Sequence, residues 1–176
     1  MPPSRVENAF ANPSCSSGAQ TATRTPSFSR QTKPARVSFV SSFVIVSIGI
    51  DIIEVARVSE VLRRTPRFRE RVFTEAERLY CDARGAAAAQ HYAVRFAAKE
   101  AALKALGTGW RRGIAWHHVE IISHESGAPA LVFRHRAREI FDELGATHSH
   151  ISLSHTSEHA IAQVILEQRY GLQEKE

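Results

Sequence analysis

Two carboxylates stand in apolar surroundings, far apart in the chain. Asp51 follows the apolar run of residues 44–50, and Glu100 lies within the long helical pattern of residues 86–106. At 100° per residue, Glu100 falls about 40° from Phe96, inside the apolar stripe of that helix. A carboxylate in such a place must cap a turn, pair with a cation or bind a metal.

Two explanations fit the second carboxylate. Glu100 and Lys104 are spaced as a helical ion pair, which on a solvated surface contributes about 0.2–0.5 kcal/mol. A pair of carboxylates without clustered Cys or His is also the ligand set of Mg²⁺, which completes its shell with water and substrate phosphate. We therefore predict Asp51 and Glu100 as metal ligands, although two acids distant in sequence do not by themselves decide the matter.

Composition limits the function classes. The 176 residues carry a formal charge of +5, but residues 1–43 hold five basic residues and one acid, so +4 lies there and only +1 in the remainder. The charge of the folded part thus gives no support for nucleic-acid binding. Cys15 and Cys81 provide no disulfide framework, which favours a reducing, cytoplasmic compartment. No run approaches the roughly 20 apolar residues of a membrane span.

The first 43 residues differ from the remainder. They are rich in Ser, Thr, Pro and Arg and nearly free of acids, a composition typical of disordered segments and also of organelle targeting peptides. A mis-called start is a further interpretation, because Val44 can be encoded by an alternative bacterial start codon. We expect a disordered extension over residues 1–43 and a folded domain over residues 44–176.

The periodicity of the domain predicts an α+β fold, with a mainly antiparallel sheet packed on a long helix. Thr74 and Glu77 form a capping box that opens a helix, and Gly107 ends the long helix. The expected elements are a strand at 44–50, helices at 54–64, 75–82 and 86–106, strands at 118–123 and 130–134, a helix at 136–145, and strands at 150–155 and 160–166.

Four ordered segments carry a resemblance to a known family. They read IGIDIIEVARV, RFAAKEAALKALGTG, GIAWHHVEI and SLSHTSEHAIAQVILE, and together they resemble the holo-[acyl-carrier-protein] synthases, the small bacterial 4′-phosphopantetheinyl transferases. The match runs from Val44 to about Glu167. The resemblance implies Mg²⁺-dependent transfer of 4′-phosphopantetheine from coenzyme A to a serine of apo acyl carrier protein, with release of adenosine 3′,5′-bisphosphate, in fatty acid biosynthesis.

The resemblance also assigns roles at the reacting phosphates. The metal-binding aspartate of the family falls on Asp51 and its glutamate on Glu100, the two acids already singled out. Lys104 would neutralise or protonate the leaving phosphate. Glu100 and a metal-ordered water are both candidates for the base that activates the acceptor serine.

Five further positions are expected to bind coenzyme A. Gly107 and Gly109 would allow close backbone approach to phosphates, although a helix C-cap explains Gly107 equally well. Ser154 and His155 match a segment that lines the coenzyme pocket. Arg95 could meet the 3′-phosphate, although a solvated basic residue is the commoner interpretation. The histidine pairs at 117–118 and 148–150 are expected at the surface because they lack further ligands.

Arg57 matches the family position that docks the carrier, and it begins a run of arginines through residue 71. Such a run is usually a solvated face, yet a basic helix would steer an acidic carrier protein. The family also forms homotrimers with active sites at subunit interfaces, so the resemblance implies a homotrimer.

Two other classes of protein remain open from the residues. A Mg²⁺-dependent nucleotide pyrophosphatase would use the two acids with water as the acceptor. A non-enzymatic module that binds an acidic protein would use the arginines but would leave Asp51 and Glu100 without a purpose. Metal dependence and the effect of an apo carrier protein distinguish these readings.

Overall fold

The computed structural model describes residues 42–109 and 113–170. The expected disordered extension therefore lies outside the described residues, except for Ser42 and Phe43, which belong to the first strand. In chain order the elements are β1 (Ser42–Glu54), α1 (Val55–Arg64), α2 (Pro66–Val72), α3 (Glu75–Asp82), the 3-10 turn η1 (Gly85–Ala87), α4 (Ala88–Ala105), the 3-10 turn η2 (Trp116–His118), β2 (Val119–Ser123), β3 (Pro129–Phe133), α5 (His135–Glu143), β4 (His148–His155) and β5 (His159–Tyr170).

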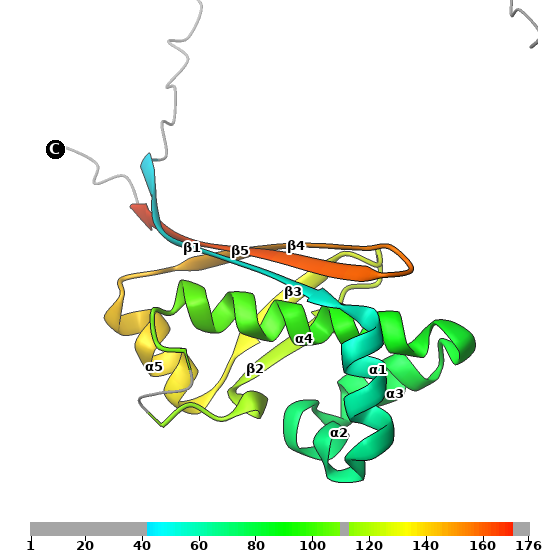
Figure 1. Ribbon diagram of the computed structural model, residues 1–176. Coiled ribbons are helices and arrows are strands. Elements are labelled where there is room, and N and C mark those ends of the chain that lie inside the picture. Colours follow the sequence, from blue (N-terminus) through cyan, green and yellow to red (C-terminus); the bar gives the residue numbers. More distant parts are fainter. Residues whose placement is uncertain (1–41, 110–112, 171–176) are drawn as a thin grey trace, which may run out of the picture. The chain divides into compact units, whose positions relative to one another are not determined.

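The strands form two antiparallel sheets. Strands β1, β5 and β4 pair in that spatial order, and β2 pairs with β3 in a separate hairpin. Helix α4 runs beneath one face of the three-stranded sheet, and the β2–β3 hairpin packs against α4 through β2 and against β4 through β3 (Figure 1). The prediction of an α+β fold with a mainly antiparallel sheet on a long helix is confirmed.

The sheet and the long helix are in backbone contact at Gly49. A methyl group at this position would lie 1.9 Å from the carbonyl oxygen of Ala101 and 2.7 Å from the backbone nitrogen of Ala105, so the contact requires glycine. Ala101 and Ala105 are themselves wholly buried. The backbone of β1 therefore lies on the backbone of α4, which fixes which α4 side chains can reach the strand.

Strand β1 is longer than predicted and does not end on Asp51. Pairing with β5 continues to Glu54, and Asp51 lies opposite Ala162 within the ladder. The expectation of a strand that stops on the aspartate is therefore wrong. The half-buried Asp51 side chain is tolerated inside the strand because it points to the helix side of the sheet, where it finds an ion-pair partner.

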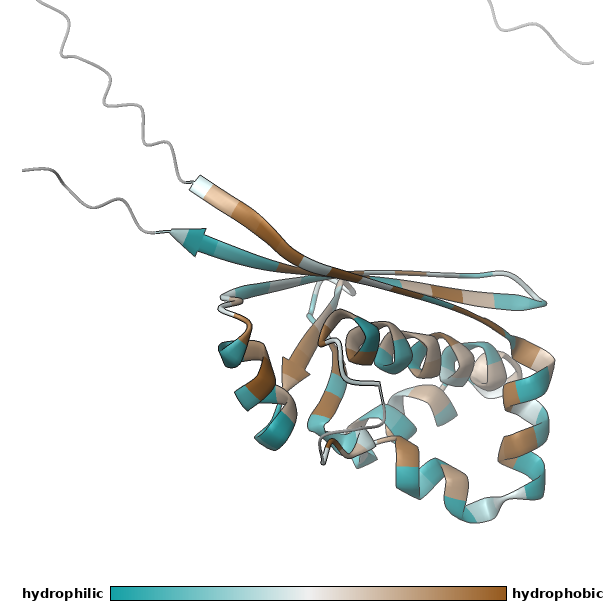
Figure 2. Cartoon of the chain, turned by 60° about the vertical axis from the view of Figure 1, so that its left-hand side comes forward, coloured by the Kyte–Doolittle hydropathy of each residue, from teal (hydrophilic) through white to brown (hydrophobic). Residues whose placement is uncertain are grey.

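The other face of β1 is apolar and exposed. Ile48, Ile50 and Ile52 are 53%, 53% and 64% exposed, and Ile161 of β5 lies on the same face. Figure 2 shows this brown, hydrophobic strand along the uncovered side of the sheet. Among the described residues no helix or strand covers that side. An apolar run of this kind is typical of a buried strand, but in the single chain one face of β1 is exposed.

Three short helices connect β1 to α4. Helix α1 buries Val55 and Val58, and it corresponds to the helix predicted at residues 54–64. Helix α2 is not among the elements that the sequence predicts, and Pro66 occupies its first turn. The capping box of Thr74 and Glu77 at the start of α3 is confirmed.

The remaining boundaries differ from the predictions by a few residues. Helix α4 begins at Ala88 after a 3-10 turn, and His118 belongs to the 3-10 turn η2 that precedes β2. Strand β5 extends to Tyr170 because it pairs along the full length of β1. Over residues 42–109 and 113–170, no helix combines the length and hydropathy needed to cross a bilayer.

Candidate active site

The two predicted metal ligands lie at one cavity. Asp51 from β1 and Glu100 from α4 both line a space of 310 Å³, together with Arg57 and Phe96. Asp51 and Glu100 are 49 positions apart in the sequence. They meet because Gly49 allows β1 to pack directly on α4. Glu100 is half-buried one turn after Phe96, as its position on the apolar stripe predicted.

Lys104 binds the other side of Asp51. Its ammonium lies 2.8 Å from Oδ1 of Asp51 and donates a second hydrogen bond of 3.0 Å to the carbonyl of Ile50. The Lys104 side chain is 51% exposed, whereas that of Asp51 is only 16% exposed. The two carboxylates of the cavity therefore have a half-exposed ammonium beside them, whose charge would attract an anion bound near Asp51.

The donor set suits a hard divalent cation with an incomplete protein shell. Among the described residues, no group of three or more His, Cys, Asp or Glu could enclose a metal. Asp51 and Glu100 thus offer carboxylate oxygens and leave other coordination positions to water or a ligand, as is usual for Mg²⁺. Arg57 is exposed at the same cavity, where a protein partner could contact it.

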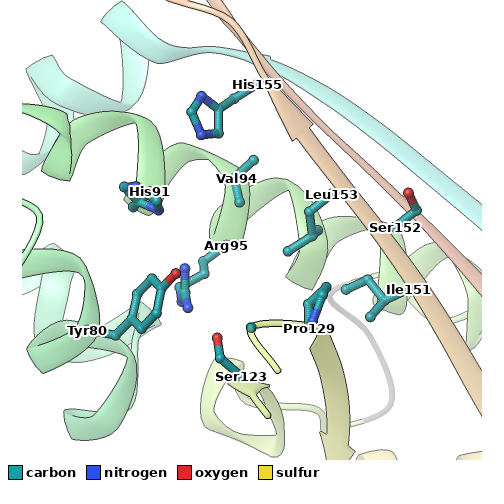
Figure 3. A pocket seen from close by; sticks show the side chains of 11 residues that line it. Tyr80, His91, Val94, Arg95, Ser123, Pro129, Ile151, Ser152, Leu153 and His155 are labelled. Carbon is teal, nitrogen blue, oxygen red and sulfur yellow. The ribbon is translucent and has the colours of Figure 1, made fainter. Parts of the chain in front are cut away.

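A second cavity contains two of the predicted coenzyme-binding residues. Arg95 of α4 and His155 of β4 line a space of 340 Å³ with Tyr80 and His91 (Figure 3). Arg95 is only 3% exposed, and its guanidinium carbon lies 3.7 Å from the centre of the Tyr80 ring. The expectation of a solvated Arg95 is therefore wrong.

The two cavities open on different faces of α4. Arg95 and Glu100 are five residues apart, which turns their side chains about 140° from each other. Neither cavity shares a lining residue with the other. A single described chain therefore keeps Arg95 and His155 apart from Asp51 and Glu100.

A family model describes much of this chain. Residues 47–164 match the 4′-phosphopantetheinyl transferase superfamily. The chain belongs to this superfamily. The match includes both cavities and every predicted site residue.

Relatives within the superfamily are named holo-[acyl-carrier-protein] synthases. That of Koribacter versatilis is 45% identical over 125 residues, which cover 70% of this chain and 99% of the relative. A crystal structure of the Bacillus anthracis synthase in complex with CoA (3′,5′-ADP) has a TM-score of 0.59 at 38% identity, over 70% of this chain and 97% of that one. The Helicobacter pylori synthase in complex with coenzyme A has a TM-score of 0.59 at 30% identity, over 68% and 98%.

The glycines and Ser154 lie outside both cavities of this transferase. Gly107 and Gly109 adopt positive φ angles of 68° and 51° directly after α4, and the backbone N–H of Gly107 donates to the carbonyl of Lys104. Both glycines therefore belong to the turn that ends α4. For Gly107, a helix C-cap was the stated alternative to a role in phosphate binding. Ser154 is exposed and alternates with His155 along β4, so it faces the uncovered side of the sheet.

A buried ion pair beside the catalytic candidates was missed. Lys99 and Glu77 are 0% and 1% exposed, and the Lys99 ammonium lies 2.9 Å from Glu77 Oε2. Lys99 also donates to the carbonyls of Trp116 and Val119. Burial lowers the pKa of Lys99, against the opposing effect of Glu77. The sequence does carry a signal for this buried pair. Lys99 and Glu100 are flanked on both sides by alanines within the predicted helix.

Not all of the other histidines are surface residues. His118 is half-buried, its Nδ1 accepts a hydrogen bond from the Ala115 N–H, and its ring centre is 5.2 Å from that of His135. Burial, followed by the nearby His135 and His117, lowers the pKa of His118. His117, His148 and His150 are exposed, as predicted.

Proposed function

We propose that this protein transfers 4′-phosphopantetheine from coenzyme A to a serine of an apo acyl carrier protein. The serine oxygen would attack the phosphorus that bears the pantetheine arm, and the bond from that phosphorus to the bridging oxygen would break. The serine hydroxyl loses its proton to a base, and adenosine 3′,5′-bisphosphate leaves. The observation that carries the proposal is the cavity that Asp51 and Glu100 line together, with the Lys104 ammonium paired to Asp51.

Asp51 and Glu100 are proposed to hold Mg²⁺. A bound Mg²⁺ would polarise the diphosphate and offset the charge that develops on its oxygens. The protein residues have separate tasks in this arrangement. The two carboxylates orient the cation and the substrate, and the Lys104 ammonium, one turn from Glu100, stabilises the leaving phosphate through a charge-assisted hydrogen bond.

We propose that the coenzyme site is completed by a second copy of the chain in a homotrimer. Arg95 and His155 line a cavity that shares no lining residue with the cavity of Asp51 and Glu100. Repetition of a head-to-tail contact around a threefold axis would place Arg95 of one copy near Asp51 of the next. The exposed isoleucines of β1 provide an apolar surface for such a contact.

Mixing two inactive variants tests this arrangement. Asp51→Ala and Arg95→Ala subunits, unfolded and reassembled together, should recover about a quarter of the wild-type sites, because a cyclic trimer pairs an intact Asp51 with an intact Arg95 at that frequency. Reassembly of each variant alone is the control. If each site lay within one chain, the mixture would stay inactive. Light scattering of the wild type, beside Ile52→Asp, tests the trimer directly.

Arg57 is proposed to dock the carrier protein, because it is exposed at the cavity that contains Asp51 and Glu100. Carrier proteins of this kind are acidic, and arginines on α1 and α2 would steer their approach. The same proposal places the protein in the cytoplasm and in fatty acid synthesis, where such carriers work.

Mass spectrometry of the carrier tests the function. The full chain is incubated with coenzyme A and an apo acyl carrier protein, with and without Mg²⁺, and the carrier should gain one phosphopantetheine only when Mg²⁺ is present. Asp51→Asn and Glu100→Gln should abolish the gain, while Glu70→Gln, which removes an exposed carboxylate on α2, should not. Adenosine 3′,5′-bisphosphate released with an unmodified carrier would instead identify a pyrophosphatase, and the transferase proposal would fail.

A further inference from the structure

Two guanidinium groups lie against the ring of Tyr80, which lines the cavity of 340 Å³. The guanidinium carbons of Arg95 and Arg84 lie 3.7 Å and 4.3 Å from the centre of the Tyr80 ring. The Nε atom of Arg95 is buried and has no hydrogen-bond partner within the described part of the chain. A buried, unsatisfied guanidinium donor costs free energy unless a ligand supplies an acceptor.

His91 adds a group to this cavity that the proposed function has not used. It lies one helical turn before Arg95, so both side chains project from the same face of α4. Its ring centre is 5.5 Å from that of His155 and 5.7 Å from that of Tyr80. Figure 3 shows Arg95, His91, His155 and Tyr80 around the same hollow.

The groups that face His91 come from three elements and the turn after α3. They are Tyr80 from α3, Arg84 from that turn, Arg95 from α4 itself and His155 from β4. Burial lowers the pKa of His91, and Arg84, His155 and Arg95 lower it further because all three repel a proton on the ring. The charges that act on His91 are therefore of one sign, and the described residues that line the cavity include no carboxylate.

We infer that His91 is a further recognition residue for coenzyme A, which with Arg95 and His155 binds the 3′-phosphate. This inference rests on the proposed function and extends it to a residue outside the catalytic cavity. The diphosphate must reach Asp51 and Glu100 for transfer to occur. Coenzyme A carries one other anionic group, the phosphomonoester at the 3′ position. This group is therefore the one available to bind at the cavity on the opposite face of α4.

Protonation of His91 is coupled to this binding. A phosphomonoester is mostly a dianion above its second pKa of about 6, and a dianion beside His91 favours the imidazolium. The His91 pKa is lowered in the free protein and rises on binding, so binding takes up a proton between those two pKa values. Affinity for the 3′-phosphate should therefore increase as the pH falls from about 8 to about 6.5.

The substrate preference tests the inference. We would measure kcat/KM for coenzyme A and for coenzyme A without its 3′-phosphate, between pH 6.5 and 8.5. His91→Gln should reduce the preference for the phosphorylated form about tenfold at pH 6.5, the effect of one charge-assisted hydrogen bond, and should leave it nearly unchanged at pH 8.5. His91→Lys should restore the preference and remove its pH dependence. His117→Gln, an exposed histidine outside this cavity, is the matched control.

Calorimetry gives a readout that does not require transfer. Binding of adenosine 3′,5′-bisphosphate, measured at pH 7 in buffers of different ionisation enthalpy, should take up protons in the wild type and fewer in His91→Gln. If His91→Gln retained both the preference and the proton uptake of the wild type, the inference would be overturned while the transferase proposal stood. A wild type that binds this nucleotide with proton uptake but never modifies the carrier would overturn the proposed function alone.

Discussion

Gly49 and Ala101 touch backbone to backbone, with no side chain between them: a methyl group on Gly49 would lie 1.9 Å from the Ala101 carbonyl oxygen. In β1, Gly49 is two residues before Asp51. In α4, Ala101 directly follows Glu100. The contact therefore sets the separation of the two carboxylates, because neither element can shift away from the other without opening the core.

Replacement of Gly49 by alanine should destabilise the protein by at least about 3 kcal/mol, because overpacking here meets backbone and not a flexible side chain. Urea denaturation measures the loss. Gly85→Ala is the control: its φ of 54° is unfavourable for alanine, but nothing lies within 4 Å of the added methyl, so it should cost only about 1–2 kcal/mol. Equal losses in the two variants would contradict the packing argument.

The buried pair of Glu77 and Lys99 should be strongly coupled. Glu77→Gln or Lys99→Met alone leaves a buried charge without its partner, which should lower the free energy of unfolding by about 3–5 kcal/mol. The double variant should lose less than the sum of the two, in a cycle measured by urea denaturation. Glu60→Gln breaks an exposed pair with Arg64 and should cost less than about 1 kcal/mol. Additive losses at Glu77 and Lys99 would show that the pair is not coupled.

Lys104 should affect the rate of transfer more than the stability of the fold. Lys104→Met should lower kcat about 100- to 1000-fold, the usual cost of one donor at a developing charge, with little change in the unfolding midpoint because the side chain is half exposed. Lys104→Arg keeps the charge and should retain more activity. The Mg²⁺ concentration for half activation should not increase in Lys104→Met, since the variant removes a cation from Asp51. A large increase would indicate that Lys104 mainly orients the metal site.

Arg57 should control encounter with the carrier. Arg57→Glu should lower kcat/KM for the apo carrier at least about tenfold at low salt and weaken its salt dependence, because a charge at the docking surface acts mainly on association. Arg63→Glu makes the same charge change on the same helix but outside the cavity lining, and its effect should be smaller. Equal effects would mean that net charge matters and the position does not.

Much of the site followed from local patterns. The apolar run before Asp51, the position of Glu100 on the apolar stripe and the capping box of Thr74 and Glu77 depend on residues close in sequence, whose periodicity expresses strand or helix geometry directly. Those patterns, with the motifs that resemble a known family, predicted the fold class and the pair of carboxylates. Helix α2 was missed because one proline both ends a helix and begins the next.

The sequence by itself determined most of the helices and strands and which faces of them carry Asp51 and Glu100. Only the tertiary structure decided that Gly49 seats β1 on α4, that Lys104 pairs with Asp51, and that Arg95 is buried beside Tyr80 on the face of α4 away from Glu100. These relations join residues tens of positions apart, and they depend on close packing between elements. Periodicity tells which way a side chain points from its own element, but not which partner it meets.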